Sequence, residues 1–417
     1  MAADNELRLL SKVVSTREIT SCLKRGVKPE WFLDDDNRRV WQFLVEHNTN
    51  YGEVPTAVTV KDNWPNFRLL KVEDTLDYLL DTMAEFIRWK LTREGLTKSV
   101  EIMSDTRDTE AVLMAMAATL AEVNAEGIPG TNEVNLVEDP MSRYDAYKAL
   151  QTDGGMLGIP TGFAKIDEAT AGLQPGQLVT IIASPKAGKS QLAMVTGINV
   201  HRDAGLPVLF QSFEMSNSET QQRHDAARSK VSHGRLRRGR LNQAEEARYI
   251  STLRSMDGRD DFRLYDAVRG MTVSSMAALI DENKPALAII DGVYLMIDEV
   301  TGESNTPAAL TNITRALKRL AQRTEIPIVI STQTLLWKMK GTKVSANSIG
   351  YSSSFFQDSD VILGLEEVED EEEIRLLKIV ASRNCGPQEV SLVWRWETGC
   401  FHDEEVMAQC PQCQGAP

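Results

Sequence analysis

The feature that most constrains the fold is the segment ASPKAGKS at residues 183–190. It follows an apolar run, QLVTII, and precedes a helical pattern that begins near Gln191, so a strand, a loop and a helix are expected in succession. The backbone N–H groups of such a loop bind phosphates, while Lys189 contacts the β- and γ-phosphates and Ser190 contacts Mg²⁺. The segment therefore predicts a phosphate loop, although Ala183 replaces the first glycine of the usual motif. The predicted nucleotide-binding residues are Ser184, Pro185, Lys186, Ala187, Gly188, Lys189 and Ser190.

The chain after Gly158 has the sequence pattern of an α/β domain. Apolar, β-branched runs alternate there with helical stretches, and they read QLVTIIA, LPVLFQSF, ALAIIDGV, IPIVIST and VILGLEE. Such alternation indicates a mostly parallel sheet that is covered on both faces. Two further runs, IRLLKIVASRN and EVSLVWRWE, are separated by Cys385-Gly386-Pro387 and predict a hairpin added to this sheet. We expect the α/β domain over residues 158–404.

The first part of the chain is helical in pattern. Its clearest stretch has apolar residues at spacings of three and four, which predicts a core-facing stripe: Leu76, Leu79, Leu80, Met83, Phe86 and Ile87. We expect a small all-α N-terminal domain over residues 1–123. Gly127, Pro129 and Gly130 then interrupt the periodicity and predict a linker over residues 124–157. Within it, residues 139–150 carry a narrow apolar stripe suited to one interface helix, and residues 405–417 form a C-terminal tail.

Composition narrows the class of protein. A chain of 417 residues exceeds the usual size of a single core, so two domains are expected. No apolar run approaches the roughly 18 residues of a membrane span, the N-terminus has no signal-peptide pattern, and the five cysteines do not suggest a disulfide framework. We therefore expect a cytoplasmic protein that is not bound to a membrane. The net charge of −14 argues against a protein that coats nucleic acid with a uniformly basic surface. It does not exclude nucleic-acid binding, because a ring-shaped protein that encloses one nucleic-acid strand needs positive charge only around its channel.

Two acidic residues follow predicted strands. Asp291 ends the run ALAIID, where a phosphate-loop site requires an acid for the metal and its water. Glu214 follows LPVLFQSF, and a carboxylate at the carboxyl end of a parallel strand faces the ligand crevice, where it could polarise the attacking water. For each, an ordinary strand-end acid is the alternative. Gln333 could sense a γ-phosphate, and a plain exposed polar residue is an equal alternative. Arg383 could reach the nucleotide of a neighbouring subunit, but the sequence chemistry alone favours a surface arginine.

Several motifs taken together resemble one family. They are GIPTGF, AGLQPG, SPKAGKS, SFEMS, IIDGVYLM and SRNCGP, and their order and spacing resemble those of the bacterial and phage DnaB-type replicative helicases of the RecA-like motor superfamily. The resemblance is specific over about residues 158–401, and over the first 120 or so it rests on helical character and size. It implies a RecA-like P-loop NTPase domain in a homo-hexameric ring, with each nucleotide between two such domains.

The implied activity is that of an ATP-dependent replicative DNA helicase. Such an enzyme hydrolyses ATP with Mg²⁺, translocates on single-stranded DNA in a 5′ to 3′ direction, and unwinds duplex at a replication fork; primase and a helicase loader are candidate partners. The alternative is a RecA-like DNA-dependent ATPase that acts as a recombination or regulatory ring without unwinding.

The resemblance also assigns roles by position. Lys189 and Ser190 match the phosphate and Mg²⁺ residues, and Asp291 matches the acid on the metal side. Glu214 matches the catalytic base, Gln333 the γ-phosphate sensor, and Arg383 the arginine finger supplied in trans. Residues 139–150 fall where the family has a linker helix that docks on the adjacent subunit.

The chain departs from the family at two places. Ala381 stands where the family commonly has a lysine two residues before the finger. The loop before Gln357-Asp358 lacks the family's arginine, so DNA contacts would come from main-chain N–H groups and neighbouring polar or basic side chains: Ser352, Ser353, Ser354, Lys338, Lys340 and Lys343.

For two further segments the sequence allows two interpretations each. Cys400, His402, Cys410 and Cys413 could form a zinc site, but free thiols are favoured because the first two lie on or beside the last strand and the tail is short. Residues 228–240 contain six Lys or Arg, and packing at the surface or an interface is favoured over DNA contact.

Overall fold

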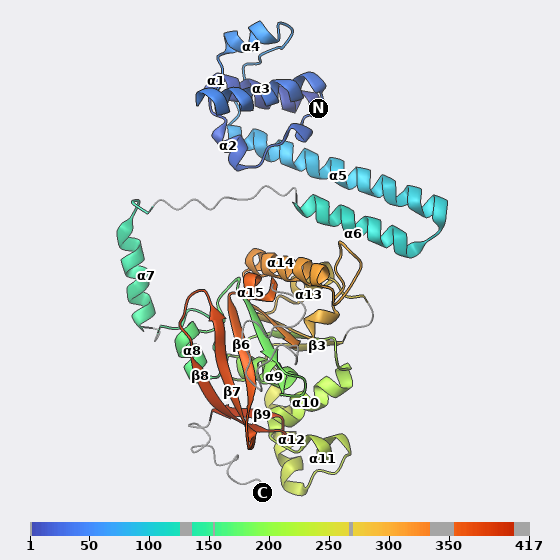
Figure 1. Cartoon of the computed structure of the whole chain (residues 1–417), viewed down its shortest axis with the longest axis vertical. Helices are drawn as coiled ribbons and strands as arrows, with labels where there is room; N and C mark the ends of the chain where they lie inside the picture. The colour runs from blue at the N-terminus through green and yellow to red at the C-terminus, as the bar shows by residue number, and fades with distance from the viewer. Residues whose placement is uncertain (1, 126–135, 153–154, 267–269, 334–353, 404–417) are drawn as a thin grey trace. The chain divides into compact units, whose positions relative to one another are not determined.

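The computed structural model describes residues 2–125, 136–152, 155–266, 270–333 and 354–403 (Figure 1). The chain divides into two compact units, Met1–Glu138 and Asp139–Pro417. The first unit contains only helices within its described residues: α1 (Ala2–Thr16), α2 (Thr20–Lys24), η1 (Pro29–Trp31), α3 (Asp35–Tyr51), α4 (Ala57–Asn63), α5 (Leu76–Thr106) and α6 (Thr109–Ala125).

Local chemistry explains where these helices begin and pack. The Asp34 carboxylate accepts from the backbone N–H groups of Asp36 and Asn37, so it caps α3, and the helix ends at Gly52 with a left-handed φ of 74°. In α5 the predicted stripe lies in the core, since Leu79, Leu80, Met83 and Ile87 are buried. The predicted all-α character of this unit is confirmed.

The second unit begins with α7 (Pro140–Thr152). This helix lies where the interface helix was expected, and its apolar residues Met141, Tyr144 and Tyr147 are exposed in the single chain. An exposed stripe of this kind leaves an apolar surface that a partner could cover.

A nine-stranded sheet forms the centre of the second unit in the part that is described (Figure 1). Its order is β3-β2-β4-β5-β1-β6-β7-β8-β9. The strands are β1 (Leu178–Ala183), β2 (Val208–Ser212), β3 (Phe262–Asp266), β4 (Leu287–Asp291), β5 (Ile328–Gln333), β6 (Val361–Val368), β7 (Glu371–Ser382), β8 (Glu389–Arg395) and β9 (Cys400–Asp403). Strands β1 to β6 pair in parallel, and β6 to β9 pair in antiparallel fashion.

These pairings confirm the predicted parallel sheet and the predicted hairpin, which is β7 with β8. The strand β3 was not predicted, because its sequence FRLYD is only partly buried and has no continuous apolar run. The acidic residues 366–373, for which the charge pattern predicts a solvated loop between strands, lie instead largely within β6 and β7, and only a short turn at Asp370 with φ 64° joins these strands.

Helices cover both faces of the sheet. On one face the core is formed with α9 (Lys189–Asn199), through residues such as Leu192 and Ile198. On the other face it is formed with α13 (Val273–Asn283) and α14 (Pro307–Thr324). The remaining elements are α8 (Ala164–Thr170), η2 (Val200–Ala204), α10 (Asn217–Ser229), α11 (His233–Arg237), α12 (Gln243–Met256), η3 (Val293–Leu295) and α15 (Ser354–Asp358). The predicted α/β class is confirmed.

Candidate nucleotide-binding and hydrolysis site

The predicted phosphate loop joins β1 to α9. Every residue of β1 is buried, and the chain then turns through a bond from the Ala187 N–H to the Ser184 carbonyl, 3.2 Å long. Gly188 has φ 103°, and a Cβ there would lie 3.0 Å from Cζ of Phe401, so only glycine fits both the backbone and the space. α9 begins at Lys189 and is entirely buried apart from Ser190 near its start. The loop therefore presents the N-terminus of a buried helix, a favourable place for anions.

Lys189 brings together the two predicted acids. Its Nζ lies 2.6 Å from Oε1 of Glu214 and 3.7 Å from Oδ1 of Asp291, and its side chain is 6% exposed. It also lies 5.5 Å from the ring centroid of Tyr294. The sheet order explains this meeting, since β1, β2 and β4 all end at the same edge. Residues from three separate segments thus form one charged cluster.

Tyr294 is a site residue that the sequence did not predict. Its hydroxyl donates to Oε1 of Glu214 over 2.7 Å and accepts from Nε2 of Gln333 over 2.8 Å. The tyrosine therefore links the predicted sensor Gln333 to the predicted base Glu214, in addition to the hydrogen bond that Gln333 itself makes to Glu214. The available signal was its place in IIDGVYLM, three residues after Asp291, but only η3 shows that the ring turns toward the site.

The environment of Glu214 favours its ionised form. Burial by itself would raise its pKa, but the ammonium of Lys189 and hydrogen bonds from Lys189, Tyr294 and Gln333 outweigh burial and lower the pKa below its ordinary value. Gly292 allows this approach, because a Cβ at that position would lie 3.0 Å from Cγ of Glu214. Glu214 is consequently a carboxylate at neutral pH, the form that can accept a proton from water.

Asp291 has a free acceptor inside the protein. It is fully buried; Oδ1 accepts from the Ser331 hydroxyl over 2.5 Å, whereas Oδ2 has no hydrogen-bond partner among the described residues. A buried carboxylate oxygen without a partner suits a bound cation or its water. Mg²⁺ takes few protein ligands beside water and phosphate, so Asp291 with the Ser190 hydroxyl fits this ion. Within the described ranges no group of three or more His, Cys, Asp or Glu forms a metal cluster.

The phosphate loop borders a cavity of about 620 Å³. This volume lies in the range of ligand pockets and suits a nucleotide. Glu214 and Gln333 line one side, while Trp394, Trp396 and Gly399 of the appended hairpins line the other. Arg375 joins the hairpin to the loop, because its Nε donates to the Ala187 carbonyl over 3.2 Å and its guanidinium lies 4.6 Å from the Trp394 ring centroid. The sequence predicted the hairpin but not its role as a wall of this cavity.

Arg383 lies away from the site of its own chain. It follows β7, whose last residue Ser382 pairs with Val361 at the start of β6, and its N–H donates to the Asp360 carbonyl over 3.0 Å. Asp360 in turn accepts from the N–H of Leu178, the first residue of β1. The phosphate loop begins after the opposite end of β1, roughly 17 Å away for a six-residue parallel strand. Ala381, where the family has a lysine, packs against the core.

The zinc and DNA hypotheses fall mostly outside the described residues. Cys410, Cys413, Lys338, Lys340, Lys343, Ser352 and Ser353 all lie there. Cys400 and His402 lie on β9, and the Cys400 thiol donates to the Ala227 carbonyl over 3.2 Å. Ser354 is buried in α15, so the surface of the single chain does not present its hydroxyl to a DNA strand.

The fold and this site define a P-loop NTPase domain of the RecA-like kind. Residues 158–403 match the family described as DnaB-like helicase C terminal domain. The chain belongs to this family.

Curated relatives agree with this membership. The chain is 27% identical over 272 residues to the replicative DNA helicase DnaB of Haemophilus influenzae, covering 64% of this chain and 57% of that protein. It is 30% identical over 282 residues to the replicative DNA helicase DnaB of Leifsonia xyli, covering 66% and 59%. The chain thus spans less than two thirds of the length of these relatives.

Solved structures show the same fold. A DnaB-like replicative helicase, described with its interactions with primase, superposes with a TM-score of 0.66 at 17% identity over 95% of this chain and 98% of that one. A second solved structure, described as an ATPase domain, gives a TM-score of 0.59 at 20% identity over 65% of this chain and 99% of that one. No helix among the described residues is both long enough and apolar enough to cross a membrane.

Proposed function

We propose that this protein is an ATP-dependent replicative DNA helicase that acts as a homo-hexameric ring. It translocates on single-stranded DNA from 5′ to 3′ and unwinds duplex DNA at a replication fork. The observation that carries the proposal is the position of Arg383 near the amino-terminal ends of β1 and β6, opposite the carboxyl ends where the phosphate loop lies. An arginine so placed is too far from its own nucleotide, but it suits the nucleotide of a neighbouring subunit, as a ring requires.

Each side chain of the site has a role in this proposal. The backbone N–H groups of residues 184–190, except Pro185, which has none, and the Lys189 ammonium bind the phosphates of ATP, and Lys189 neutralises charge that develops on the γ-phosphate. Glu214 accepts a proton from the attacking water, which its lowered pKa allows. Gln333 senses the γ-phosphate and transmits its position through Tyr294 to Glu214.

Mg²⁺ would be held by the Ser190 hydroxyl and, directly or through water, by Oδ2 of Asp291. When bound, the ion would neutralise charge on the β- and γ-phosphates. Ser331 orients Asp291 by its hydrogen bond to Oδ1, which leaves Oδ2 directed to the ion.

The domain arrangement is part of the proposal. Residues 1–123 form the N-terminal domain, 124–157 the linker, 158–404 the motor and 405–417 the tail. The exposed stripe of α7 supports docking of this helix on an adjacent subunit, which would bury Met141, Tyr144 and Tyr147. Primase is a candidate partner because the similar solved helicase was described with primase, and a loader is expected for a closed ring.

The second candidate is a RecA-like DNA-dependent ATPase that forms a recombination or regulatory ring. The likeness in fold to a DnaB-like replicative helicase over 95% of this chain, helical unit included, favours the helicase.

Unwinding of a forked duplex separates the two candidates. With ATP and Mg²⁺, we expect strand separation on a duplex that carries a 5′ single-stranded tail. We expect none on a duplex whose only single-stranded tail is a 3′ tail. Lys189→Ala protein serves as the control for contaminating helicases. Hydrolysis stimulated by DNA without strand separation would favour the second candidate, and unwinding from the 3′ tail would reverse the proposed direction.

A further inference from the structure

The side chain of Arg383 contacts its own chain at two points. Its Nη2 donates to the Gln357 carbonyl over 3.1 Å, and its Nη1 lies 3.5 Å from Oδ1 of Asp360. The side chain is nevertheless 54% exposed. A guanidinium has five N–H donors, so donors remain for a phosphate that belongs to another chain. The two contacts therefore orient the arginine and leave it able to bind.

Asp360 is held firmly between two elements of the core. Its Oδ2 accepts from the N–H of Leu178, the first residue of β1, over 2.8 Å and from Nζ of Lys318 in α14 over 2.6 Å. The Asp360 N–H also donates to the Leu178 carbonyl, and the Asp360 side chain is only 10% exposed. Because these bonds use Oδ2, Oδ1 is the oxygen that lies toward Arg383.

The acceptor on Gln357 is fixed in a similar way. Gln357 belongs to α15, in which Phe355 is fully buried in the core. The next residue, Asp358, accepts from the Thr314 hydroxyl of α14 over 2.7 Å. Arg383 thus contacts two acceptors whose positions are set by the packing of this domain.

We propose that Asp360 is the positioning residue of the arginine finger Arg383. The inference rests on the proposed function, in which Arg383 acts on the nucleotide of a neighbouring subunit. An arginine side chain that moves freely in solvent loses rotamer entropy when it binds a phosphate. Asp360 restricts this motion before the neighbour's nucleotide is bound, so less entropy is lost as the site forms. In this role Asp360 acts only through Arg383 and contacts no nucleotide.

A purely structural role for Asp360 would have a different consequence. β1 begins at Leu178 and leads to the phosphate loop of the same chain. Loss of packing at Asp360 would therefore impair hydrolysis in the subunit that carries the substitution. Loss of positioning would instead impair hydrolysis in the neighbouring subunit, which receives the arginine.

Asp360→Asn removes the attraction for Arg383 and can keep the packing bonds. The amide oxygen can take the place of Oδ2, which accepts from Leu178 and Lys318. The amide nitrogen then lies toward the guanidinium, and both groups are donors. The substitution therefore acts mainly on the orientation of the arginine.

Mixed rings separate the two roles. In the parent mixture, Lys189→Ala subunits supply Arg383 to Arg383→Ala subunits, which keep their phosphate loop. Asp360→Asn is added either to the subunit that supplies the arginine or to the subunit that hydrolyses ATP. With the first arrangement we expect kcat of the recovered hydrolysis to fall about tenfold with no change in KM for ATP, since a contact with a charged group is lost. With the second we expect kcat to stay within about twofold of the parent mixture.

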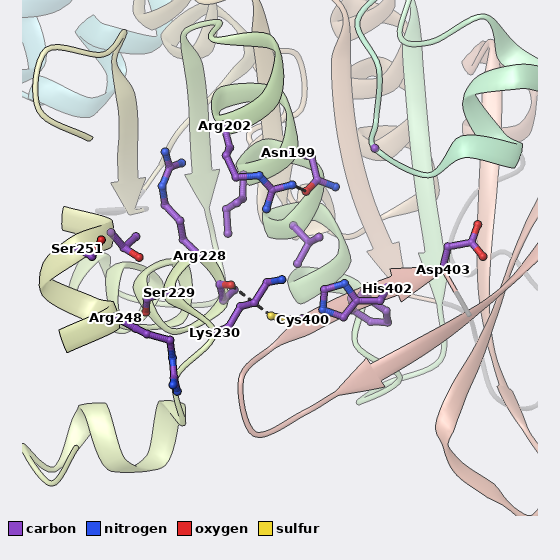
Figure 2. A pocket seen from close by; sticks show the side chains of 16 residues that line it. Asn199, Arg202, Arg228, Ser229, Lys230, Arg248, Ser251, Cys400, His402 and Asp403 are labelled. Atoms are coloured by element: carbon purple, nitrogen blue, oxygen red, sulfur yellow. Dashed lines mark hydrogen bonds between the residues drawn. The ribbon is translucent and has the colours of Figure 1, made fainter. Parts of the chain in front are cut away.

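Asp203→Asn in the subunit that supplies the arginine is the matched control. Asp203 is the acidic partner of Arg202, whose Nε lies 2.6 Å from Oδ1 of Asp203. Arg202 also donates to Oδ1 of Asn199 over 3.0 Å, beside a cavity along α9 (Figure 2). Neither Asp360 nor Arg383 lines that cavity. The control breaks an aspartate–arginine pair of the same kind and should leave the recovered hydrolysis unchanged.

A second variant covers a failure of Asp360→Asn to fold. That substitution leaves the Lys318 ammonium, whose side chain is 14% exposed, without its carboxylate partner. Asp360→Asn combined with Lys318→Met removes both charges of the pair, a change that is often neutral for buried ion pairs. We expect the same difference between the two arrangements of mixed rings.

The inference and the proposed function fail in different ways. If Asp360→Asn leaves the recovered kcat unchanged in the subunit that supplies the arginine, or lowers it as much in the subunit that hydrolyses ATP, the inference is overturned and the action of Arg383 in trans stands. An equal loss with Asp203→Asn would overturn it too. If the parent mixture itself recovers no hydrolysis, although co-purification proves mixed rings, the trans role of Arg383 in the proposed function is wrong and the inference is wrong with it.

Discussion

The Lys189 ammonium lies 2.6 Å from Oε1 of Glu214, so the cation expected on the phosphates contacts the expected base. Both side chains lie at the carboxyl ends of the parallel strands, Lys189 with 6% and Glu214 with 27% exposure. ATP phosphates would compete with Glu214 for this ammonium. Tyr294 would keep Glu214 in place after the ammonium moves, because its hydroxyl contacts the same Oε1.

Lys189→Ala should abolish ATP hydrolysis. The γ-phosphate loses its main cationic contact while charge develops on it in the transition state. Phosphate release in the presence of single-stranded DNA measures this. Turnover at the wild-type rate would contradict the assignment of residues 184–190 as a phosphate loop.

Glu214→Gln should leave nucleotide binding and ring assembly largely intact. Hydrolysis should slow by about a hundredfold or more, because loss of a general base costs about 10²–10⁴ in rate. Fluorescent nucleotide titration and phosphate release give the two quantities. Glu219→Gln is the matched control, since this glutamate lies in α10 outside the cavity. If ATP affinity collapses in Glu214→Gln, the residue is structural.

Tyr294→Phe tests the path from Gln333 to Glu214. The hydroxyl donates to ionised Glu214, so its loss should raise the pKa of Glu214 and move the acidic limb of the rate profile to higher pH. We expect kcat to fall about tenfold at neutral pH with little change in KM, the effect of one hydrogen bond to a charged group. Tyr265→Phe removes a hydroxyl at the edge strand β3 and should change neither quantity. An unshifted pH profile would show that Tyr294 only packs.

Arg383→Ala tests the ring and the site together. Alone it should be nearly inactive, because an arginine finger contributes about 10³–10⁵ in rate. Mixed with Lys189→Ala protein it should recover hydrolysis, since an Arg383→Ala subunit keeps its phosphate loop and the Lys189→Ala neighbour supplies the arginine. The recovered rate should be greatest at intermediate mixing ratios.

The mixing experiment requires proof of mixed rings, by co-purification of differently tagged subunits. If hydrolysis is not recovered at any mixing ratio, Arg383 does not belong to the site and the hexamer proposal is weakened. Ala381→Lys is a companion variant, and faster hydrolysis would place the turn after β7 against the neighbour's phosphates.

Purified protein should contain no stoichiometric zinc. Cys400 is buried and its thiol already donates to the Ala227 carbonyl, which disfavours its use as a metal ligand. Elemental analysis tests this. About one zinc per chain that is lost in Cys410→Ser would instead identify the tail as a metal-binding module.

The local features of this protein could be predicted from its sequence. The phosphate loop, the buried strands β1, β2, β4 and β5, and the stripe of α5 depend on short-range rules: the backbone freedom of Gly188, hydrophobic periodicity, and turn chemistry. The strand-end positions of Glu214, Asp291 and Gln333 follow from the same rules, because each of these residues follows or ends an apolar run.

Other features depend on which strands become neighbours, which local patterns do not encode. The order β2-β4-β5-β1 brings Glu214, Asp291 and Lys189 to one edge, and η3 turns the Tyr294 ring into that cluster. Because β7 runs antiparallel to β6, Arg383 lies at the opposite, amino-terminal ends of the parallel strands. In the sequence Arg228 is one cation of a basic run, and only the packed structure shows that it is buried, with 7% exposure. The sequence determined the elements and their chemistry, and long-range packing decided which side chains meet, because contacts between distant segments form only in the assembled core.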